Sequence, residues 1–232
     1  MRLEHVPTPA YVIDLAKLEA NCRILQYVQE EAGCKVLLAQ KAYSLYKTYP
    51  LISQYLSGTT ASGLYEAKLA IEEFPGEVHV FAPAFKDADL EELLEITDHI
   101  VFNSERQLRK HGPRCRASGI SVGLRLNPQC STQGDHALYD PCAPGSRFGV
   151  TLDKIPSDLL DLVDGLHFHT LCEQGSEDLE TTLKAVEAQF GPYLHEVKWL
   201  NMGGGHHITR DDYDVDLLIS EIKRIRETYN LE

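Results

Sequence analysis

The stretch KVLLAQ, residues Lys35–Gln40, is an apolar run without the alternation of a half-buried strand. Such a run predicts a strand that is buried on both faces, as in a parallel sheet. Six further short strand-like segments follow, separated by segments with helical periodicity or turn residues. Alternating strands and helices indicate an α/β fold. The predicted core strands are 35–40, 59–61, 78–82, 100–102, 122–126, 165–169 and 197–201.

The segments between these strands carry helix signals. Apolar residues recur at helical spacing from Leu15 to about Ala32, after a short strand expected at Ala10–Asp14. Asp87 is expected to cap a helix, and Ser104 with Gln107 three residues later has the pattern of a capping box. A further helix is expected within 47–57, and the other predicted helices are 64–73, 87–96, 177–190 and 215–229.

The number of strands decides between two architectures. A TIM-type (β/α)8 barrel needs eight strands, and seven are predicted. The chain ends where the helix 215–229 would lead into the eighth. We therefore expect one barrel domain over residues 1–232 that is incomplete at its C-terminus. The alternative is an open, doubly wound sheet.

Composition and net charge favour some classes of ligand and some cellular locations over others. The 232 residues are 43% hydrophobic and carry a formal net charge of −13, which disfavours nucleic acid and suits a cationic ligand. Six cysteines without a CxxC pair indicate free thiols in a reducing compartment. No signal peptide and no apolar run of membrane-spanning length are visible, so we expect a cytoplasmic protein without a membrane partner.

Two predicted strand ends carry residues suited to a phosphorylated aldehyde. Lys41 follows the first core strand, where a desolvated amine could form a Schiff base, although a lysine there could also simply extend to the rim. Gly203, Gly204 and Gly205 follow the last strand, where backbone N–H groups could converge on an anion. The alternative is a plain flexible turn.

Two further strands add polar residues inside apolar runs. His167 and His169 face the same side of a strand and could be metal ligands, acid–base groups, rings stacked on a cofactor, or core residues. Arg125 needs an acceptor, and it could bind a cofactor heteroatom, orient His169 or form an internal ion pair. Together with Lys41 and the glycines they suit pyridoxal 5'-phosphate (PLP), which combines an aldehyde, an aromatic ring and a phosphate.

The sequence resembles the fold-type III PLP enzymes, the group of alanine racemase and of the ornithine and diaminopimelate decarboxylases. Within that group it is most similar to the carboxynorspermidine (carboxyspermidine) decarboxylase family. The segments that carry the resemblance are Thr8–Val12, Leu38–Ala42, Thr59–Ser62, Tyr139–Pro144, Ser146–Gly149, His167–Glu173 and Asn201–His207. The most specific are the two within the loop 139–149, together with His167–Glu173 and Asn201–His207.

The resemblance implies roles for individual residues. Lys41 would bind the cofactor aldehyde as a Schiff base, His169 would stack on the ring, and Gly203–Gly205 would bind the phosphate. Arg125 would lie near the ring. Three residues are implied with less specific motifs: Ser62 and Cys172 would line the cofactor pocket, and Arg147 would contact phosphate or substrate.

The resemblance also implies a function. We expect PLP-dependent decarboxylation of carboxynorspermidine or carboxyspermidine to norspermidine or spermidine, by a homodimer, without a metal. The family's last barrel strand and C-terminal β-domain have no counterpart in these 232 residues. Three alternatives are a decarboxylase or racemase acting on diaminopimelate, ornithine or lysine, a non-catalytic PLP-binding barrel, and a zinc-dependent barrel hydrolase that uses His167 and His169 with His206 or an Asp as a further ligand.

Overall fold

All seven predicted core strands are present in the computed structural model, which describes residues 3–134 and 137–231. They form one parallel sheet in which neighbouring strands follow the order of the chain. The strands are β1 Leu37–Ala39, β2 Gly58–Ala61, β3 Glu77–Phe81, β4 His99–Phe102, β5 Ser121–Arg125, β6 Gly165–His167 and β7 Trp199–Asn201.

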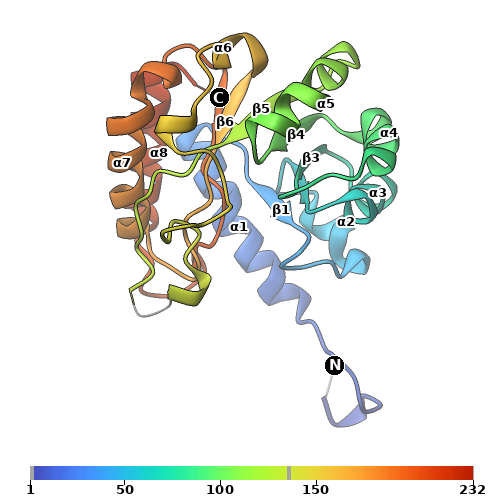
Figure 1. Cartoon of the computed structure of the whole chain (residues 1–232). Coiled ribbons are helices and arrows are strands. Elements are labelled where there is room, and N and C mark those ends of the chain that lie inside the picture. The colour runs from blue at the N-terminus through green and yellow to red at the C-terminus, as the bar shows by residue number, and fades with distance from the viewer. Residues whose placement is uncertain (1–2, 135–136, 232) are drawn as a thin grey trace.

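The strand order identifies the architecture. A doubly wound sheet reverses its strand order at a switch point, whereas β1 to β7 run consecutively. The sheet curls with its helices on the outside (Figure 1), and β1 and β7 are its two edges within the described residues. The fold is therefore an unclosed barrel of the TIM type, as predicted, and the doubly wound alternative is wrong.

The helices agree closely with the predicted ranges, with two corrections. Residues 10–14 form no strand; they extend away from the domain (Figure 1), where Tyr11 is fully exposed and finds no ladder partner. Lys86, not Asp87, is the cap of its helix, and the carboxylate of Asp87 lies in the first turn. The helices are α1 Leu15–Ala32, α2 Tyr49–Ile52, α3 Leu64–Glu73, α4 Asp87–Ile96, α5 Glu105–Ala117, α6 Leu159–Leu162, α7 Ser176–Leu194 and α8 Val215–Tyr229.

The indole of Trp199 lies inside the barrel. A Cβ at Gly165 would collide with the indole of Trp199, and a Cβ at Gly123 would collide with its edge. Trp199 Nε1 donates a hydrogen bond to Ser121 Oγ at 2.8 Å. The two glycines on neighbouring strands thus make room for the indole, which closes the interior beneath the carboxyl ends of the strands.

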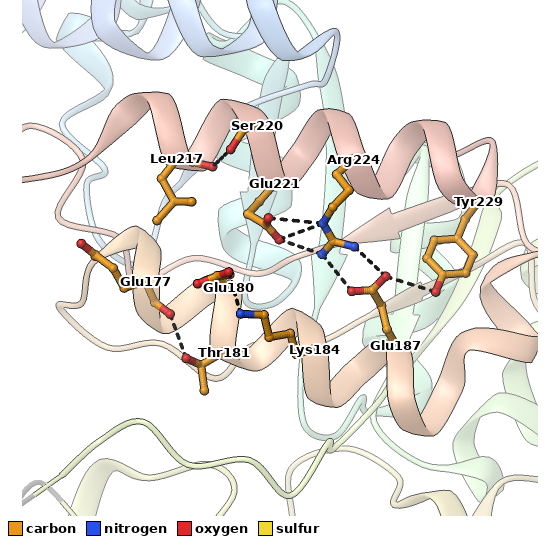
Figure 2. Close-up of polar contacts among 10 residues, drawn as sticks. All are labelled: Glu177, Glu180, Thr181, Lys184, Glu187, Leu217, Ser220, Glu221, Arg224 and Tyr229. Atoms are coloured by element: carbon orange, nitrogen blue, oxygen red, sulfur yellow. Dashed lines mark hydrogen bonds and ion pairs between the residues drawn. The ribbon is translucent and has the colours of Figure 1, made fainter.

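The helix layer is held by charged side chains. Figure 2 shows Arg224 of α8 between two carboxylates, with its Nη1 and Nη2 each donating to Glu187 of α7 at 2.8 Å and its Nη2 donating to Glu221 at 2.7 Å. Arg226 then joins α8 to α1, because its Nη1 donates to the carbonyl oxygen of Ala32 at 2.8 Å. These contacts fix α7, α8 and α1 side by side.

Two expectations from composition can be compared with the structure. All six cysteines are free thiols, as predicted. Within the described residues, none of the helices combines the length and the apolar character that a bilayer crossing requires.

Candidate active site

The predicted site residues gather at the carboxyl ends of the strands. Lys41 lies two residues beyond β1, Arg125 is the last residue of β5, and His169 lies two residues beyond β6. Ser62 directly follows β2, and the turn Gly203–Gly205 begins two residues beyond β7. Because the strands are parallel, these ends meet at one edge of the sheet, where α/β barrels carry their chemistry.

Arg125 is a buried cation without a carboxylate partner. Its side chain lies between the rings of Phe81 and Phe148, with its Cζ 4.9 and 4.8 Å from the two ring centroids. Arg125 Nη2 donates to the carbonyl oxygen of His169 at 2.9 Å. Its Nε is buried without a partner, and burial lowers the pKa of Arg125 to about 10, so the group stays charged at neutral pH.

This environment decides between the two interpretations of Arg125. The residue is 3% exposed and forms no ion pair with any described residue, so the predicted internal ion pair is not present. A buried cation with an unused donor is unfavourable unless an acceptor reaches it. The arrangement therefore suits a ligand that brings a heteroatom or a negative charge.

The glycine turn lies tightly against the loop after β6. Gly203 has φ of +73°, and a Cβ there would lie 2.5 Å from the carbonyl oxygen of Phe168. Gly205 has φ of +95°, and a Cβ there would collide with the carbonyl group of Leu171. Both positions need glycine because of their left-handed backbone and because of this close approach.

The amides of this turn are mostly engaged within the protein. Gly203 N donates to Asn201 Oδ1 at 2.8 Å, and Gly204 N donates to His169 Nδ1 at 3.0 Å. Gly205 N has no hydrogen-bond partner in the described part of the chain. An anion would therefore find one free amide at once, and the other two only after they exchange partners.

His169 is a neutral imidazole with an assigned tautomer. Because Nδ1 accepts the hydrogen bond from Gly204, the neutral ring carries its proton on Nε2. Burial, followed by the charges of Lys41 and Arg125, lowers the pKa of His169 to about 3. Lys41 is thus close enough for its charge to influence the pKa of His169. The side chain of Lys41 is exposed, however, so the predicted desolvation of its amine is absent in this chain.

His167 points into the barrel and connects to the glycine turn. Its Nδ1 donates to Asn201 Oδ1 at 2.9 Å, and burial lowers the pKa of this 7%-exposed residue to about 3. Asn201 therefore joins His167 to Gly203. Sequence reasoning assigned no role to Asn201, although its place two residues before the glycine triplet puts it on the strand's inner face.

The zinc interpretation finds no ligand set at this edge. Nδ1 of His167 and Nδ1 of His169 are both hydrogen-bonded, and Nδ1 of His206 lies 2.8 Å from the hydroxyl of Tyr213. Among the residues that the structure describes, these three histidines do not belong to a metal-ligating cluster. A hydrolytic metal centre built from them is not supported.

Two asparagines that sequence reasoning missed hold the loop 139–149 at Arg125. Asn103 Oδ1 accepts from Gly149 N at 2.9 Å, and its Nδ2 donates to the carbonyl oxygen of Arg147 at 2.8 Å. Asn127 Nδ2 donates to the carbonyl oxygen of Phe148 at 3.1 Å. Each asparagine lies one or two residues beyond a strand end, which was the available signal.

The remaining predicted residues lie at the rim. Ser62 is exposed, and its N donates to Glu66 Oε2 at 2.6 Å. Cys172 is exposed, and its N donates to Gln174 Oε1 at 3.3 Å, while Gln174 N donates to the carbonyl oxygen of Gly205 at 3.0 Å. The side chain of Arg147 is exposed. The structure thus brings together Arg125, His169 and the glycine turn, with Cys172 connected indirectly.

The fold is that of the barrel found in fold-type III PLP decarboxylases. The structure superimposes on that of a diaminopimelate decarboxylase with a TM-score of 0.72 and 20% identity, over 93% of this chain and 57% of the other. Another neighbour of the same fold was solved with PLP and cadaverine. No protein-family model matches the chain.

Relatives with higher identity narrow this class. The chain is 40% identical to the carboxynorspermidine/carboxyspermidine decarboxylase of Campylobacter jejuni, over all of this chain and 60% of the relative. It is 38% identical to the carboxyaminopropylagmatine decarboxylase of Synechocystis, over 98% of this chain and 59% of the relative. The crystal structure of the Campylobacter jejuni carboxynorspermidine decarboxylase complexed with norspermidine matches with a TM-score of 0.91 and 38% identity, over 98% of this chain and 58% of that one.

The chain is therefore a homologue of carboxynorspermidine/carboxyspermidine decarboxylase with the barrel fold of the fold-type III decarboxylases. It spans about 60% of the length of these relatives.

Proposed function

We propose that this chain is the barrel of a PLP-dependent carboxy-lyase that converts carboxynorspermidine or carboxyspermidine to norspermidine or spermidine. The observation that carries the proposal is the buried guanidinium of Arg125. Its Nε has no acceptor, and it lies beside His169 and the glycine turn in a chain homologous to these decarboxylases throughout its length. The unused donor and the free amide of Gly205 fit a ligand with a ring heteroatom or oxygen and a phosphate.

Different residues at this edge would hold different parts of the cofactor. Gly205 offers its free amide to the phosphate, and Gly203 and Gly204 add theirs when Asn201 and His169 release them. Arg125 Nε donates to an acceptor near the ring. Lys41 supplies the amine that bonds covalently to the aldehyde. When bound, PLP supplies an electron sink for the electron pair that remains when CO₂ leaves.

His169 contributes through its neutral charge. A neutral imidazole can lie flat against a ring without adding a second cation beside Arg125 and Lys41. As long as Nδ1 accepts from Gly204, the ring proton stays on Nε2 and can be donated. We expect Ser62 and Cys172, which are exposed at this edge, to line the cofactor site, and Arg147 to contact the phosphate or the substrate.

The substrate class follows from the relatives and from charge. The Campylobacter jejuni and Synechocystis relatives are 40% and 38% identical, and both are named for carboxylated polyamine derivatives. A net charge of −13 favours a polycationic substrate over an anionic one. Carboxyaminopropylagmatine is therefore the second candidate, ahead of diaminopimelate, ornithine and lysine, whose decarboxylases resemble this chain at 20% identity or less.

The cofactor assignment is tested by trapping. The chain is incubated with PLP, reduced with borohydride and digested, and the labelled peptide is located by mass spectrometry. We expect the label on Lys41 and loss of the visible absorbance band in Lys41→Ala. Lys47→Ala is the matched control, since this exposed lysine lies in the same segment. A band that persists in Lys41→Ala, or a label on another lysine, would contradict the assignment.

The reaction is tested by CO₂ release. Carboxynorspermidine, carboxyspermidine, carboxyaminopropylagmatine and diaminopimelate are compared at equal concentration, with the full-length protein loaded with PLP. We expect release from the carboxylated polyamines to exceed release from diaminopimelate. Equal or greater release from diaminopimelate would move the function to another decarboxylase, and no release from any substrate would favour a non-catalytic PLP-binding barrel.

The homodimer and the cytoplasmic location stay predictions. In support of a dimer, the loop beside the site exposes three large apolar side chains, Leu138, Tyr139 and Phe148, of which Leu138 is 88% exposed. Such side chains are unfavourable in water unless another surface covers them. Light scattering of the full-length protein measures its mass directly, and a monomer would contradict the prediction.

A further inference from the structure

A second group of polar side chains lies at the opposite, amino-terminal end of the sheet. His79 of β3 is directly opposite His99 of β4 in the strand register. Glu77 precedes His79 by two residues, so both point to the same face of β3. We propose that Glu77, His79 and His99 bind one late first-row divalent cation, with Zn²⁺ as the reference ion, inside this end of the barrel.

The distances bring the three side chains within reach of one ion. One ligand atom from each of the three lies within 4.8 Å of the other two, and all three residues are half-buried. Glu77 Oε2 lies 2.9 Å from His79 Nε2. The two imidazole rings are stacked, with centroids 4.1 Å apart and an interplanar angle of 6°. No other such group of three occurs within residues 3–134 and 137–231.

The chemistry of the three ligands matches the ion. Two imidazoles and one carboxylate form a common protein set for Zn²⁺, and imidazole also suits Co²⁺, Ni²⁺ and Cu²⁺.

Internal contacts compete with the ion. Lys35 Nζ donates to Glu77 Oε1 at 2.7 Å and places a positive charge beside the proposed site. The parallel rings must also tilt apart so that their nitrogen lone pairs converge on one point. If the cluster binds a cation, removing the ammonium of Lys35 should increase the affinity for that cation. A cluster with a purely structural role gives no such expectation.

This cluster is separate from the candidate active site. Ser121 is the register partner of His99, and Arg125 lies four residues further along β5, which is about 13 Å at ~3.3 Å per residue. The inference therefore does not depend on the proposed function. Trp199, the sole tryptophan of the sequence, packs edge-on against His99 with ring centroids 5.4 Å apart, so its fluorescence reports on this site.

The experiment titrates the chain, freed of metal with a chelator, with Zn²⁺ by calorimetry and with Co²⁺ by quenching of Trp199 fluorescence. The variants are His99→Gln, Glu77→Gln and Lys35→Met. The matched control is His195→Gln, because His195 also packs on an aromatic ring, that of Tyr229, but lies at the C-terminal end of α7 and is not one of the three clustered residues. Thermal unfolding without metal checks that each variant is folded.

We expect one Zn²⁺ per chain. Since the loss of a supporting residue already weakens metal sites about 10- to 100-fold, His99→Gln and Glu77→Gln should weaken binding at least tenfold. Lys35→Met should tighten it, and His195→Gln should leave it unchanged. Absence of a one-to-one complex, an equal loss in His195→Gln, or weaker binding in a folded Lys35→Met would overturn the inference.

Discussion

Two arginines in this chain have opposite surroundings. Arg224, at the contact between α7 and α8, is held by the carboxylates of Glu187 and Glu221, which raise its pKa (Figure 2). Arg125, at the carboxyl end of the sheet, donates one hydrogen bond to a carbonyl oxygen and lies between two aromatic rings. Burial lowers its pKa. A charge with all its partners inside the protein holds helices together, whereas a buried charge without a carboxylate is unfavourable until an acceptor reaches it, which is why we propose a ligand at Arg125.

The largest effect is expected at the glycine turn. Gly203→Ala places a Cβ 2.5 Å from the carbonyl oxygen of Phe168 on a left-handed backbone, which alone costs about 1–2 kcal/mol. The turn must shift, so affinity for PLP should fall about 100-fold or more, measured by quenching of Trp199 fluorescence.

Gly204→Ala is the control for this substitution. A Cβ there would meet only His169 Cε1, at 4.0 Å, and its φ lies outside the left-handed range. Affinity for PLP should change by less than about threefold. A similar loss in both variants would show that the turn does not act through its conformation.

Arg125→Met comes next and tests the comparison directly. Replacing a buried charge that lacks an ionic partner by an apolar side chain is often neutral or stabilising, so the melting temperature without cofactor should stay the same or rise. Affinity for PLP should fall about 10- to 100-fold, as expected when a hydrogen bond to a charged group is lost. A large loss of stability with unchanged affinity would assign Arg125 a structural role.

Arg224→Met should give the opposite result. It leaves Glu187 and Glu221 without their cation and should lower the free energy of unfolding by about 1 kcal/mol, allowing for the partial exposure of Arg224. Affinity for PLP should not change. Lys184→Met, which removes an exposed pair with Glu180 on α7, should cost no more than about 0.5 kcal/mol. Equal effects in denaturant unfolding would contradict the importance of the two-carboxylate network.

The smallest effect concerns pH. Burial lowers the pKa of His206 from its usual 6.5 to about 4. The unfolded chain therefore takes up a proton below pH 6.5 that the folded chain refuses until about pH 4, and stability falls as pH drops through this window. His206→Gln, which can still hydrogen-bond Tyr213, should make the melting temperature less sensitive to pH between 7 and 5. An unchanged slope would show that His206 protonates freely in the fold.

Much of the fold was predictable because its signals are local. Short strand-like runs between helical segments located all seven strands, and helical periodicity located α1, α3, α4 and α8 within one residue. The failures have physical causes. Residues 10–14 have strand-like composition, but a strand needs a neighbour to pair with, and none lies beside them. Composition cannot report whether that neighbour is present.

The sequence by itself determined which residues end at the carboxyl edge of the sheet, because strand direction and strand ends follow from the order of the runs. Only the tertiary structure decided which of them find partners. Arg125 meets the carbonyl group of His169 across 44 positions, Asn103 meets Gly149 across 46, and His79 meets His99 through strand register. Such contacts depend on how the strands align and how deeply each group is buried, and neither property can be inferred from a local sequence pattern.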